Sequence, residues 1–472
     1  MERLVNGELV QVDVSALNDD GLGEGRVAGA AAVIGNGLPG ERGEALVVHR
    51  GQNKSVLRLF ELKGSAHSAR VAAECPRWTP ASPCRLMHTS GEFQLEFKRD
   101  LVRRALQAQG QGANVAPTVS AGKQTGWRSR VIYLARQHRG QALLGAYRRG
   151  SHQVQGMLDC LLPEPALLSL SEALVAILQE FRALLPHATA ALDPGCGEPL
   201  ELNQLRANLG RPVSPTTRGS DGELHYVTLR ANAAGDCMVC FLGDLTPDTG
   251  RELAKRCLKA GATSVFVGAS GPGDAVFGAE APTWVAGAKS LLDEVDGLSF
   301  ELLPRTFFQV HRSAAARLQR DALAHVVGER VLDVFSGVGA LALRAAQSGR
   351  RVTAIESVPE ARALALSNAE RNGLELELVG SEADQALQTL LDAERAFDTV
   401  FVNPPRKGLG PGVAPRLLEL APERIVYVSC NPKSLARDLS ALGQSYRLTS
   451  VTPYDLFPAS EHVETLAVLE RA

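Results

Sequence analysis

The feature that most constrains the fold is a regular alternation of strand-like and helix-like segments in the last third of the chain. From about Glu301, apolar runs typical of strands at 330–335, 352–355, 399–402 and 424–429 alternate with helix-like segments at 341–348 and 360–372. Strands separated by helices are typical of βαβ units, which form a mostly parallel sheet with helices on both faces. We therefore predict an α/β fold with a doubly wound, Rossmann-like domain over residues 301–472.

The remaining length predicts two further units, because 472 residues exceed the roughly 100–200 of one ordinary domain. Residues 1–65 contain short alternating apolar segments separated by glycine-rich turns, a pattern that predicts a small β-barrel. Residues 66–300 combine amphipathic helical patterns at 92–109 and 167–185 with strand-like segments, which predicts a central α/β domain.

Charge is balanced over the whole chain but not locally. The formal net charge is −2, yet residues 66–160 hold 14 Lys and Arg against 5 Asp and Glu. The basic residues include Lys98, Arg99, Arg103, Arg104, Arg128, Arg130, Arg136, Arg139, Arg148 and Arg149. Such a patch indicates a surface that faces a polyanion such as RNA, although a solvated surface that maintains solubility explains the charge equally well.

The composition excludes collagen, a coiled coil and a wholly disordered chain. A hydrophobic share of 45% and a charged share of 22% are typical of a globular chain. No apolar run reaches the roughly 18 residues of a membrane span, and the start lacks the pattern of a signal peptide, so we expect a cytoplasmic protein with no membrane partner.

Eight cysteines are too few for a secreted disulfide scaffold. Cys237 and Cys240 form a C-x-x-C pair inside an apolar strand-like run, where this spacing places the side chains on opposite faces, so we interpret both as core residues. Cys196 and Cys257 have no partner pattern and are interpreted as buried thiols.

Chemically useful residues gather at the predicted strand ends. The strand at 330–335 leads into a G-x-G loop and a helix, a geometry that holds nucleoside cofactors, and Glu356 ends the next strand, where an acidic residue can bind ribose hydroxyls. Asn403-Pro404-Pro405 and Cys430 follow two later strands, and a carboxylate, Glu464, stands beside a histidine near the C-terminus.

Five motifs in this order and spacing resemble the RNA uracil-C5 methyltransferases that use S-adenosylmethionine (SAM). They are Phe307-Phe308-Gln309-Val310, 333–339, 403–408, Ser429-Cys430-Asn431-Pro432 and His462-Val463-Glu464. The first 65 residues resemble the TRAM domain of that family, an OB-type barrel that binds RNA. Residues 145–152 and 158–160 resemble its central domain, so the likeness covers nearly the whole chain.

The resemblance implies a role for each site residue. Cys430 would add to C6 of the uracil, which makes C5 nucleophilic, and Glu464 would then remove the C5 proton. The residues that would bind SAM are Gln309, Phe335, Gly337, Gly339, Glu356 and Asn403. The uracil must leave its stack to reach the thiol, so a loop of structured RNA is the expected substrate.

Two positions depart from the family pattern. Asn403 replaces the usual Asp before Pro-Pro-Arg, which removes a charge from the cofactor site. Many members bind an iron–sulfur cluster through four cysteines, whereas here only Cys75, Cys84 and Cys160 are in place, so an intact cluster is doubtful. The three thiols would instead hold a three-ligand cluster, bind zinc with His88, or be remnants.

Several functional alternatives stay open. Within the resemblance, large-subunit ribosomal RNA is preferred to transfer RNA as the substrate, because TRAM-bearing members tend to be of that type. Asn403-Pro404-Pro405 also resembles the loop of methyltransferases that act on base amines, although Arg406 stands where those enzymes have an aromatic residue. A catalytically inactive RNA-binding relic is the third possibility. No protein partner is implied.

Overall fold

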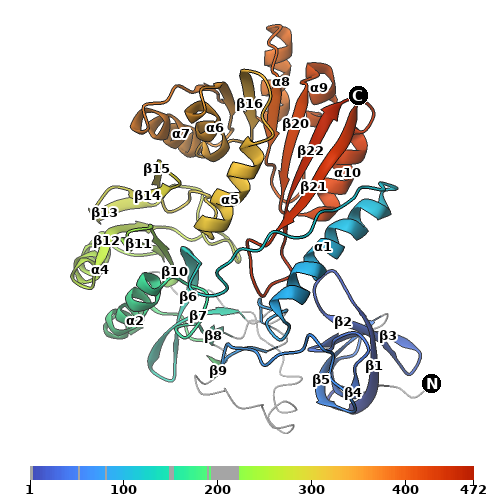
Figure 1. Cartoon of the computed structure of the whole chain (residues 1–472). Helices are drawn as coiled ribbons and strands as arrows, with labels where there is room; N and C mark the ends of the chain where they lie inside the picture. Colours follow the sequence, from blue (N-terminus) through green and yellow to red (C-terminus); the bar gives the residue numbers. More distant parts are fainter. Residues whose placement is uncertain (1–3, 52–53, 80–81, 148–153, 189–190, 193–222) are drawn as a thin grey trace.

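The structure, a computed structural model, describes residues 4–51, 54–79, 82–147, 154–188, 191–192 and 223–472. Figure 1 shows a small barrel near the N-terminus, a central sheet with its helices, and a C-terminal sheet, with helix α1 (Gly91–Ala108) between the barrel and the C-terminal sheet. Arg148, Arg149 and Cys196 lie outside the described residues. In the described part of the chain, no helix is long and apolar enough to cross a membrane.

Five strands close the N-terminal barrel in the order β1-β2-β3-β5-β4. They are β1 (Leu9–Leu17), β2 (Gly23–Val27), β3 (Ala30–Gly35), β4 (Arg42–His49) and β5 (Lys54–Leu62). Alternate side chains such as Val12, Val14, Ile34 and Leu57 fill the interior because successive strand residues point to opposite faces. The predicted small β-barrel is confirmed.

The central sheet has the order β13-β12-β11-β10-β6-β7-β8-β9 among the described residues. Its strands are β6 (Arg130–His138), β7 (Gln141–Tyr147), β8 (Val154–Gly156), β9 (Ala191–Leu192), β10 (Leu224–Ala231), β11 (Cys237–Gly243), β12 (Ala262–Gly268) and β13 (Thr283–Gly287). The helical elements are α2 (Pro165–Glu180), η1 (Arg182–Leu184) and α4 (Pro247–Lys259). Cys237 and Cys240 are buried in different hydrophobic clusters on opposite faces of β11, and Cys257 is buried on α4, as predicted.

The C-terminal sheet confirms the predicted doubly wound α/β fold. Its order is β18-β17-β16-β19-β20-β22-β21, with parallel pairing from β18 to β20 and antiparallel pairing on both sides of β22. The strands are β16 (Arg330–Val334), β17 (Arg351–Ile355), β18 (Glu377–Val379), β19 (Thr399–Val402), β20 (Arg424–Ser429), β21 (Tyr446–Tyr454) and β22 (Glu464–Arg471). The helices are α5 (Arg312–Leu323), α6 (Ala340–Gln347), α7 (Pro359–Arg371), α8 (Ala383–Asp392), α9 (Val413–Leu420) and α10 (Pro432–Leu442).

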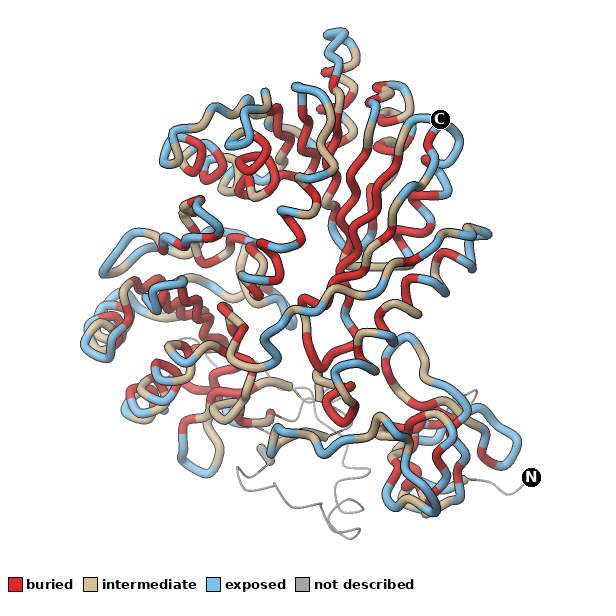
Figure 2. The backbone as a smooth tube through the Cα atoms, viewed as in Figure 1, coloured by how far each residue is buried: buried red, intermediate tan, exposed pale blue. Residues whose placement is uncertain are grey.

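Buried strands form the core of this sheet, and Figure 2 shows them largely in red, whereas the helices around them carry both buried and exposed residues. Val331 and Phe401 pack with α5 and α6 on one face, whereas Leu332 and Val400 pack with α8 and α9 on the other. A hairpin of β14 (Leu291–Val295) and β15 (Leu298–Leu302) packs against α5 and α7. Both faces of the sheet are therefore covered beneath the carboxyl ends of its parallel strands.

The predicted polyanion-facing surface is partly wrong. Lys98 is fully buried, and Arg136 is also buried and donates hydrogen bonds to the carbonyl oxygens of Ala135 and His225. Arg103, Arg104 and Arg139 remain exposed. Helix α1 turns Lys98 inward because its apolar side packs on α10 and β21 of the C-terminal sheet, a contact that local charge counting does not reveal.

Candidate active site

A cavity of about 770 Å³ opens at the carboxyl ends of β16, β19 and β20. Seven residues predicted for the site line it, namely Gln309, Phe335, Gly337, Glu356, Asn403, Cys430 and Glu464. The carboxyl ends of parallel strands meet at one edge of a sheet, so residues more than 150 positions apart in the sequence share one cavity. Gly339 is not among the lining residues and caps the adjoining helix α6.

The loop after β16 adopts a conformation that few residues tolerate. Phe335 has φ +74°, Gly337 has φ +57° and Gly339 has φ +90°. A Cβ atom at Gly339 would lie 3.2 Å from Cγ of Leu343 in addition to the strained φ. A bulky residue such as Phe335 at positive φ is uncommon and is typical of ligand sites.

Glu356 follows the neighbouring strand β17 and forms a hydrogen bond with this loop. One carboxylate oxygen accepts a hydrogen bond from the Gly337 amide at 2.9 Å, and the other accepts one from the Val358 amide at 2.8 Å. A carboxylate has about four acceptor positions, so two remain for donors in the cavity. This geometry is compatible with ribose hydroxyls.

Asp333 is a site residue that the sequence analysis did not single out. Burial raises its pKa to about 7, and the backbone amide of Ala342 donates to Oδ2 at 3.0 Å. Oδ1 is buried and has no hydrogen-bond partner among the described residues, although Asp333 lines the cavity. A buried carboxylate oxygen of this kind fits a cationic ligand group, and SAM carries both an ammonium and a sulfonium. The signal was the Asp at the strand end before the G-x-G loop.

Cys430 also lines the cavity and lies directly after β20. Its thiol is partly buried, and burial and the carboxylate of Glu464 raise its pKa. The guanidinium of Arg406 opposes both effects through its charge and a hydrogen bond to Cys430. Arg406 is the second residue that the sequence analysis left without a role in the site. The pKa remains raised overall, so the thiol form is favoured, and Arg406 is the group that favours the nucleophilic thiolate.

The loops that carry Cys430 and Arg406 are joined by Asn431. The side-chain amide of Asn431 donates to the carbonyl oxygen of Arg406 at 2.9 Å. Its carboxamide oxygen caps α10 by accepting from the Lys433 amide at 3.1 Å. Asn431 therefore holds the loop that carries the Cys430 thiol against the loop that carries the Arg406 guanidinium.

Glu464 begins β22 and is fully buried against the same cavity. Burial raises its pKa to about 7, while hydrogen bonding by Gln309 and the charge of Arg406 act in the opposite direction. Gln309 was predicted to bind SAM. In the structure it lines the cavity and its side chain forms a hydrogen bond with Glu464. A carboxylate with a pKa near 7 can accept or release a proton at physiological pH.

The three thiols predicted as possible metal ligands lie outside this cavity. Burial raises the pKa of Cys84 to about 12, with further contributions from Cys160 and Cys75. Burial lowers the pKa of nearby His88 to about 4. Within the described residues, no group of three or more His, Cys, Asp and Glu side chains is arranged to hold a metal ion. The effects of Cys75 and Cys160 on the pKa of Cys84 place the three thiols near one another.

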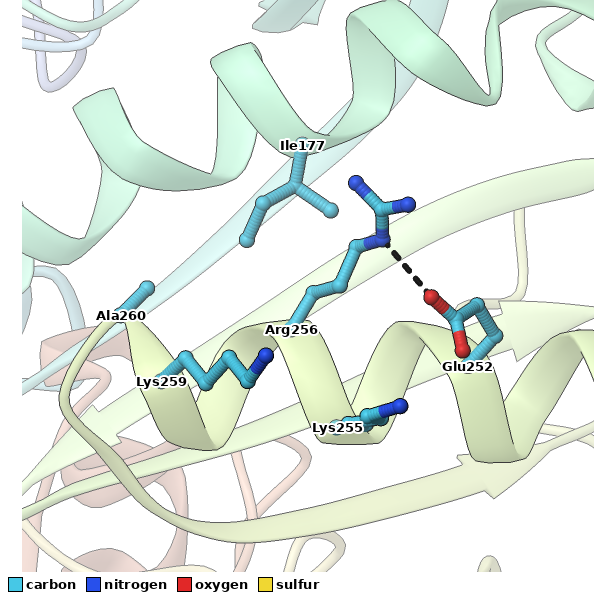
Figure 3. A pocket seen from close by; sticks show the side chains of 6 residues that line it. All are labelled: Ile177, Glu252, Lys255, Arg256, Lys259 and Ala260. Atoms are coloured by element: carbon cyan, nitrogen blue, oxygen red, sulfur yellow. Dashed lines mark hydrogen bonds and ion pairs between the residues drawn. The ribbon is translucent and has the colours of Figure 1, made fainter.

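A second, shallow hollow lies between α2 and α4 and is drawn in Figure 3. It is lined by Ile177, Glu252, Lys255, Arg256, Lys259 and Ala260. Arg256 donates to Glu252 at 3.0 Å, so its charge is compensated within the wall. No residue predicted for the site lies in this hollow.

Comparison with known proteins agrees with this geometry. The tRNA (Uracil-5-)-methyltransferase family matches residues 313–472. An uncharacterized RNA methyltransferase of Gloeobacter violaceus is 30% identical over 485 residues, which cover 99% of this chain and 98% of that protein. A 23S rRNA (uracil(1939)-C(5))-methyltransferase of Edwardsiella ictaluri is 29% identical over 478 residues, which cover 100% of this chain and 98% of that protein.

A solved structure is similar over the whole chain. The tRNA (uracil-54, C5)-methyltransferase of Pyrococcus abyssi, in complex with S-adenosyl-L-homocysteine, superposes with a TM-score of 0.71 at 25% identity, covering 98% of this chain and 100% of that one. Together the fold and the cavity define a SAM-dependent methyltransferase. The chain belongs to the family of RNA (uracil-C5)-methyltransferases.

Proposed function

We propose that this protein methylates C5 of a uridine in structured RNA, with large-subunit ribosomal RNA as the preferred substrate, through a covalent bond between Cys430 and C6 of the base. The observation that carries the proposal is the placement of a thiol and a protonatable carboxylate in one cavity. Arg406 acts electrostatically on both Cys430 and Glu464, so the two groups lie within range of one guanidinium.

The proposed reaction begins at Cys430. Its thiolate adds to C6 and forms an S–C6 bond, and the electron pair of the C5=C6 bond moves into the ring as an enolate. Arg406 keeps the thiolate accessible by opposing the effect of burial on its pKa. SAM, when bound, supplies the methyl group that C5 takes, and S-adenosylhomocysteine leaves.

Glu464 completes the proposed cycle. C5 then carries both a methyl group and a hydrogen, and the carboxylate of Glu464 removes that proton. The C–H electron pair restores the C5=C6 bond, the S–C6 bond breaks, and Cys430 leaves as thiolate. A pKa of about 7 suits this step because a base is most effective when its pKa is near the working pH.

The proposed cofactor end of the cavity consists of the predicted SAM residues together with Asp333. Glu356 would accept hydrogen bonds from the ribose, and Asp333 would face the positive charge of the methionine part. The loops at Phe335, Gly337 and Gly339 would let the ligand approach the backbone. Asn403 would close over the cofactor through hydrogen bonds in place of charge.

The proposed division into domains follows the expected boundaries at residues 65 and 300, with an RNA-binding TRAM barrel and a central RNA-binding domain before the methyltransferase domain. Asp19, in the loop between β1 and β2, pairs with Lys433 at the start of α10 at 2.8 Å. RNA held by the barrel would therefore lie close to Cys430.

Ribosomal RNA is preferred as the substrate because the 23S rRNA methyltransferase of Edwardsiella ictaluri is similar over the whole length of this chain. The tRNA methyltransferase of Pyrococcus abyssi makes transfer RNA the alternative. Mapping 5-methyluridine in both RNAs from cells without this protein separates the two, since only the true substrate loses the modification.

The covalent step is tested with Cys430→Ala and with RNA that contains 5-fluorouridine at the target. The wild-type protein should form a denaturant-resistant adduct because fluorine cannot be removed as a proton, and Cys430→Ala should form none. Methylation by Cys430→Ala at the wild-type rate would refute the proposal. A methylated base amine as the product would favour the amino-methyltransferase alternative, and RNA binding without SAM binding would favour the relic.

A further inference from the structure

One buried lysine lies where the connection between β21 and β22 meets helix α1. This connection, residues 455–463, leads directly into Glu464, and Figure 1 shows it as a red segment below the sheet beside α1. Phe457, His462 and Val463 of the connection line the active-site cavity. Any displacement of the connection therefore moves both a cavity wall and the proposed base.

Lys98 binds the first part of this connection. Its ammonium forms an ion pair with Asp455 and donates to the carbonyl oxygen of Phe457 at 2.9 Å. The same oxygen atom of Asp455 accepts from the Phe457 amide at 3.2 Å. Lys98 is fully buried and Asp455 is 2% exposed, so water does not replace either contact.

A second side chain of α1 binds the middle of the connection. Gln94, one helical turn before Lys98, accepts a hydrogen bond from the Ala459 amide at 2.8 Å. The carbonyl oxygen of Ala459 accepts in turn from the Leu86 amide at 2.9 Å. Ala459 has φ +64°, a strained conformation for alanine that persists only when the surroundings enforce it.

We propose that Lys98, assisted by Gln94, is a positioning residue that holds the 455–463 connection and so places Glu464 for removal of the C5 proton. Lys98 touches neither substrate nor cofactor in this scheme and acts through the backbone of Phe457. The inference rests on the proposed function of Glu464 as the base. Proton removal depends steeply on distance, and a displacement of about 1 Å can slow a step by about 100-fold.

The inference separates two steps of the reaction. Addition of Cys430 to C6 and transfer of the methyl group need the thiol, Arg406 and a bound cofactor. Cys430 and Arg406 lie on segments other than the 455–463 connection. Only the release of the methylated base needs Glu464. A displaced connection should therefore leave a methylated protein–RNA adduct that forms at a nearly normal rate and breaks down slowly.

The test compares Lys98→Met with Lys98→Met/Asp455→Asn on RNA containing ordinary uridine. The single variant leaves Asp455 as a buried unpaired charge, which is strongly destabilising, whereas the double variant removes both charges and keeps an acceptor for the Phe457 amide. Single-turnover experiments measure adduct formation by denaturing gel and release by the appearance of free 5-methyluridine RNA. For the folded double variant, we expect adduct formation at a rate within about 3-fold of wild type and product release slowed about 10- to 100-fold.

Two controls separate positioning from stability. Leu106→Ala creates a cavity in the same helix without touching the connection, so it should lower the amount of folded enzyme and leave the ratio of adduct to product unchanged. Lys259→Met makes the same chemical change at an exposed position of α4 and should behave as wild type. Gln94→Met removes only the Ala459 contact and should cause a smaller stall of the same kind.

Failure of the inference differs from failure of the proposed function. If wild type forms the 5-fluorouridine adduct but the folded double variant releases product at the wild-type rate, Lys98 has no positioning role. If formation and release slow equally in both Lys98 variants, the ion pair is structural only, and the inference is also overturned. If wild type forms no adduct at all, the covalent chemistry itself fails and the inference fails with it.

Discussion

The unusual protonation of Glu464 predicts that removing its charge makes the protein more stable. Burial raises the pKa of this carboxyl from 4.5 to about 7, so between these two pH values the folded state keeps a proton that the unfolded state releases. Stability therefore falls as the pH rises through this window, and the loss is complete above pH 7. Each pKa unit corresponds to about 1.4 kcal/mol, so the ionised carboxylate costs the fold about 3 kcal/mol at pH 8.

Glu464→Gln removes this cost while keeping the shape of the side chain. We expect the variant to be more stable than wild type by about 3 kcal/mol at pH 8 and by less than about 0.5 kcal/mol near pH 4.5, where only half of the unfolded carboxyl groups are ionised. Denaturant unfolding of both proteins at the two pH values measures the difference. The same variant should accumulate the RNA adduct, so stability and turnover should change in opposite directions.

The control is Glu419→Gln, a change of the same type on the exposed side of α9. It should alter stability by less than about 0.5 kcal/mol at either pH, as surface substitutions usually do. An equal gain for Glu464→Gln at both pH values would show that ionisation is not the cause. A loss of stability at pH 8 would show that the carboxylate is stabilised in the fold, contrary to its raised pKa.

Three further predictions concern other residues of the cavity and of the loop beside it. Arg406→Gln should move the pH midpoint for alkylation of Cys430 by iodoacetamide upward, because the guanidinium lowers the pKa of this thiol, and an unchanged midpoint would contradict the assigned contact. Asp333→Asn should weaken SAM binding in calorimetry by about 10-fold or more through loss of a charge-assisted hydrogen bond, and equal affinity would remove Asp333 from the cofactor site. Gly339→Ala should lower thermal stability by about 1–2 kcal/mol, since its φ is +90° and Leu343 lies close, whereas an unchanged Tm would mean that the loop relaxes freely.

The fold was largely predictable because its signals are local. Alternating apolar segments and glycine-rich turns indicate strands of a barrel, and strand–helix succession after residue 301 indicates a parallel sheet. Cys237 and Cys240 illustrate the same point, since the period of two in a strand places them on opposite faces without further information. Such patterns depend only on backbone geometry.

The sequence predicted most of the residues that form the site, but not which of them contact one another. Strand ends indicated residues such as Glu356 and Cys430. Gln309 and Glu464 were assigned only through the family resemblance, and the hydrogen bond between them joins separate segments of the chain. The same holds for Asn431, which links the Cys430 loop to Arg406. Sequence spacing carries no information on which side chains of different loops meet, because that depends on how helices and strands pack.

Lys98 shows the difference between what the sequence determines and what only the tertiary structure decides. The sequence by itself determined the barrel and the doubly wound sheet, because these follow from periodicity and chain direction. That Glu464 acts together with Cys430 was expected only from the family resemblance. Only the tertiary structure decided that a lysine on a basic helix is buried against Asp455, 357 positions further along the chain. A charge is exposed or buried according to what packs over it, and packing between distant segments is a property of the whole fold.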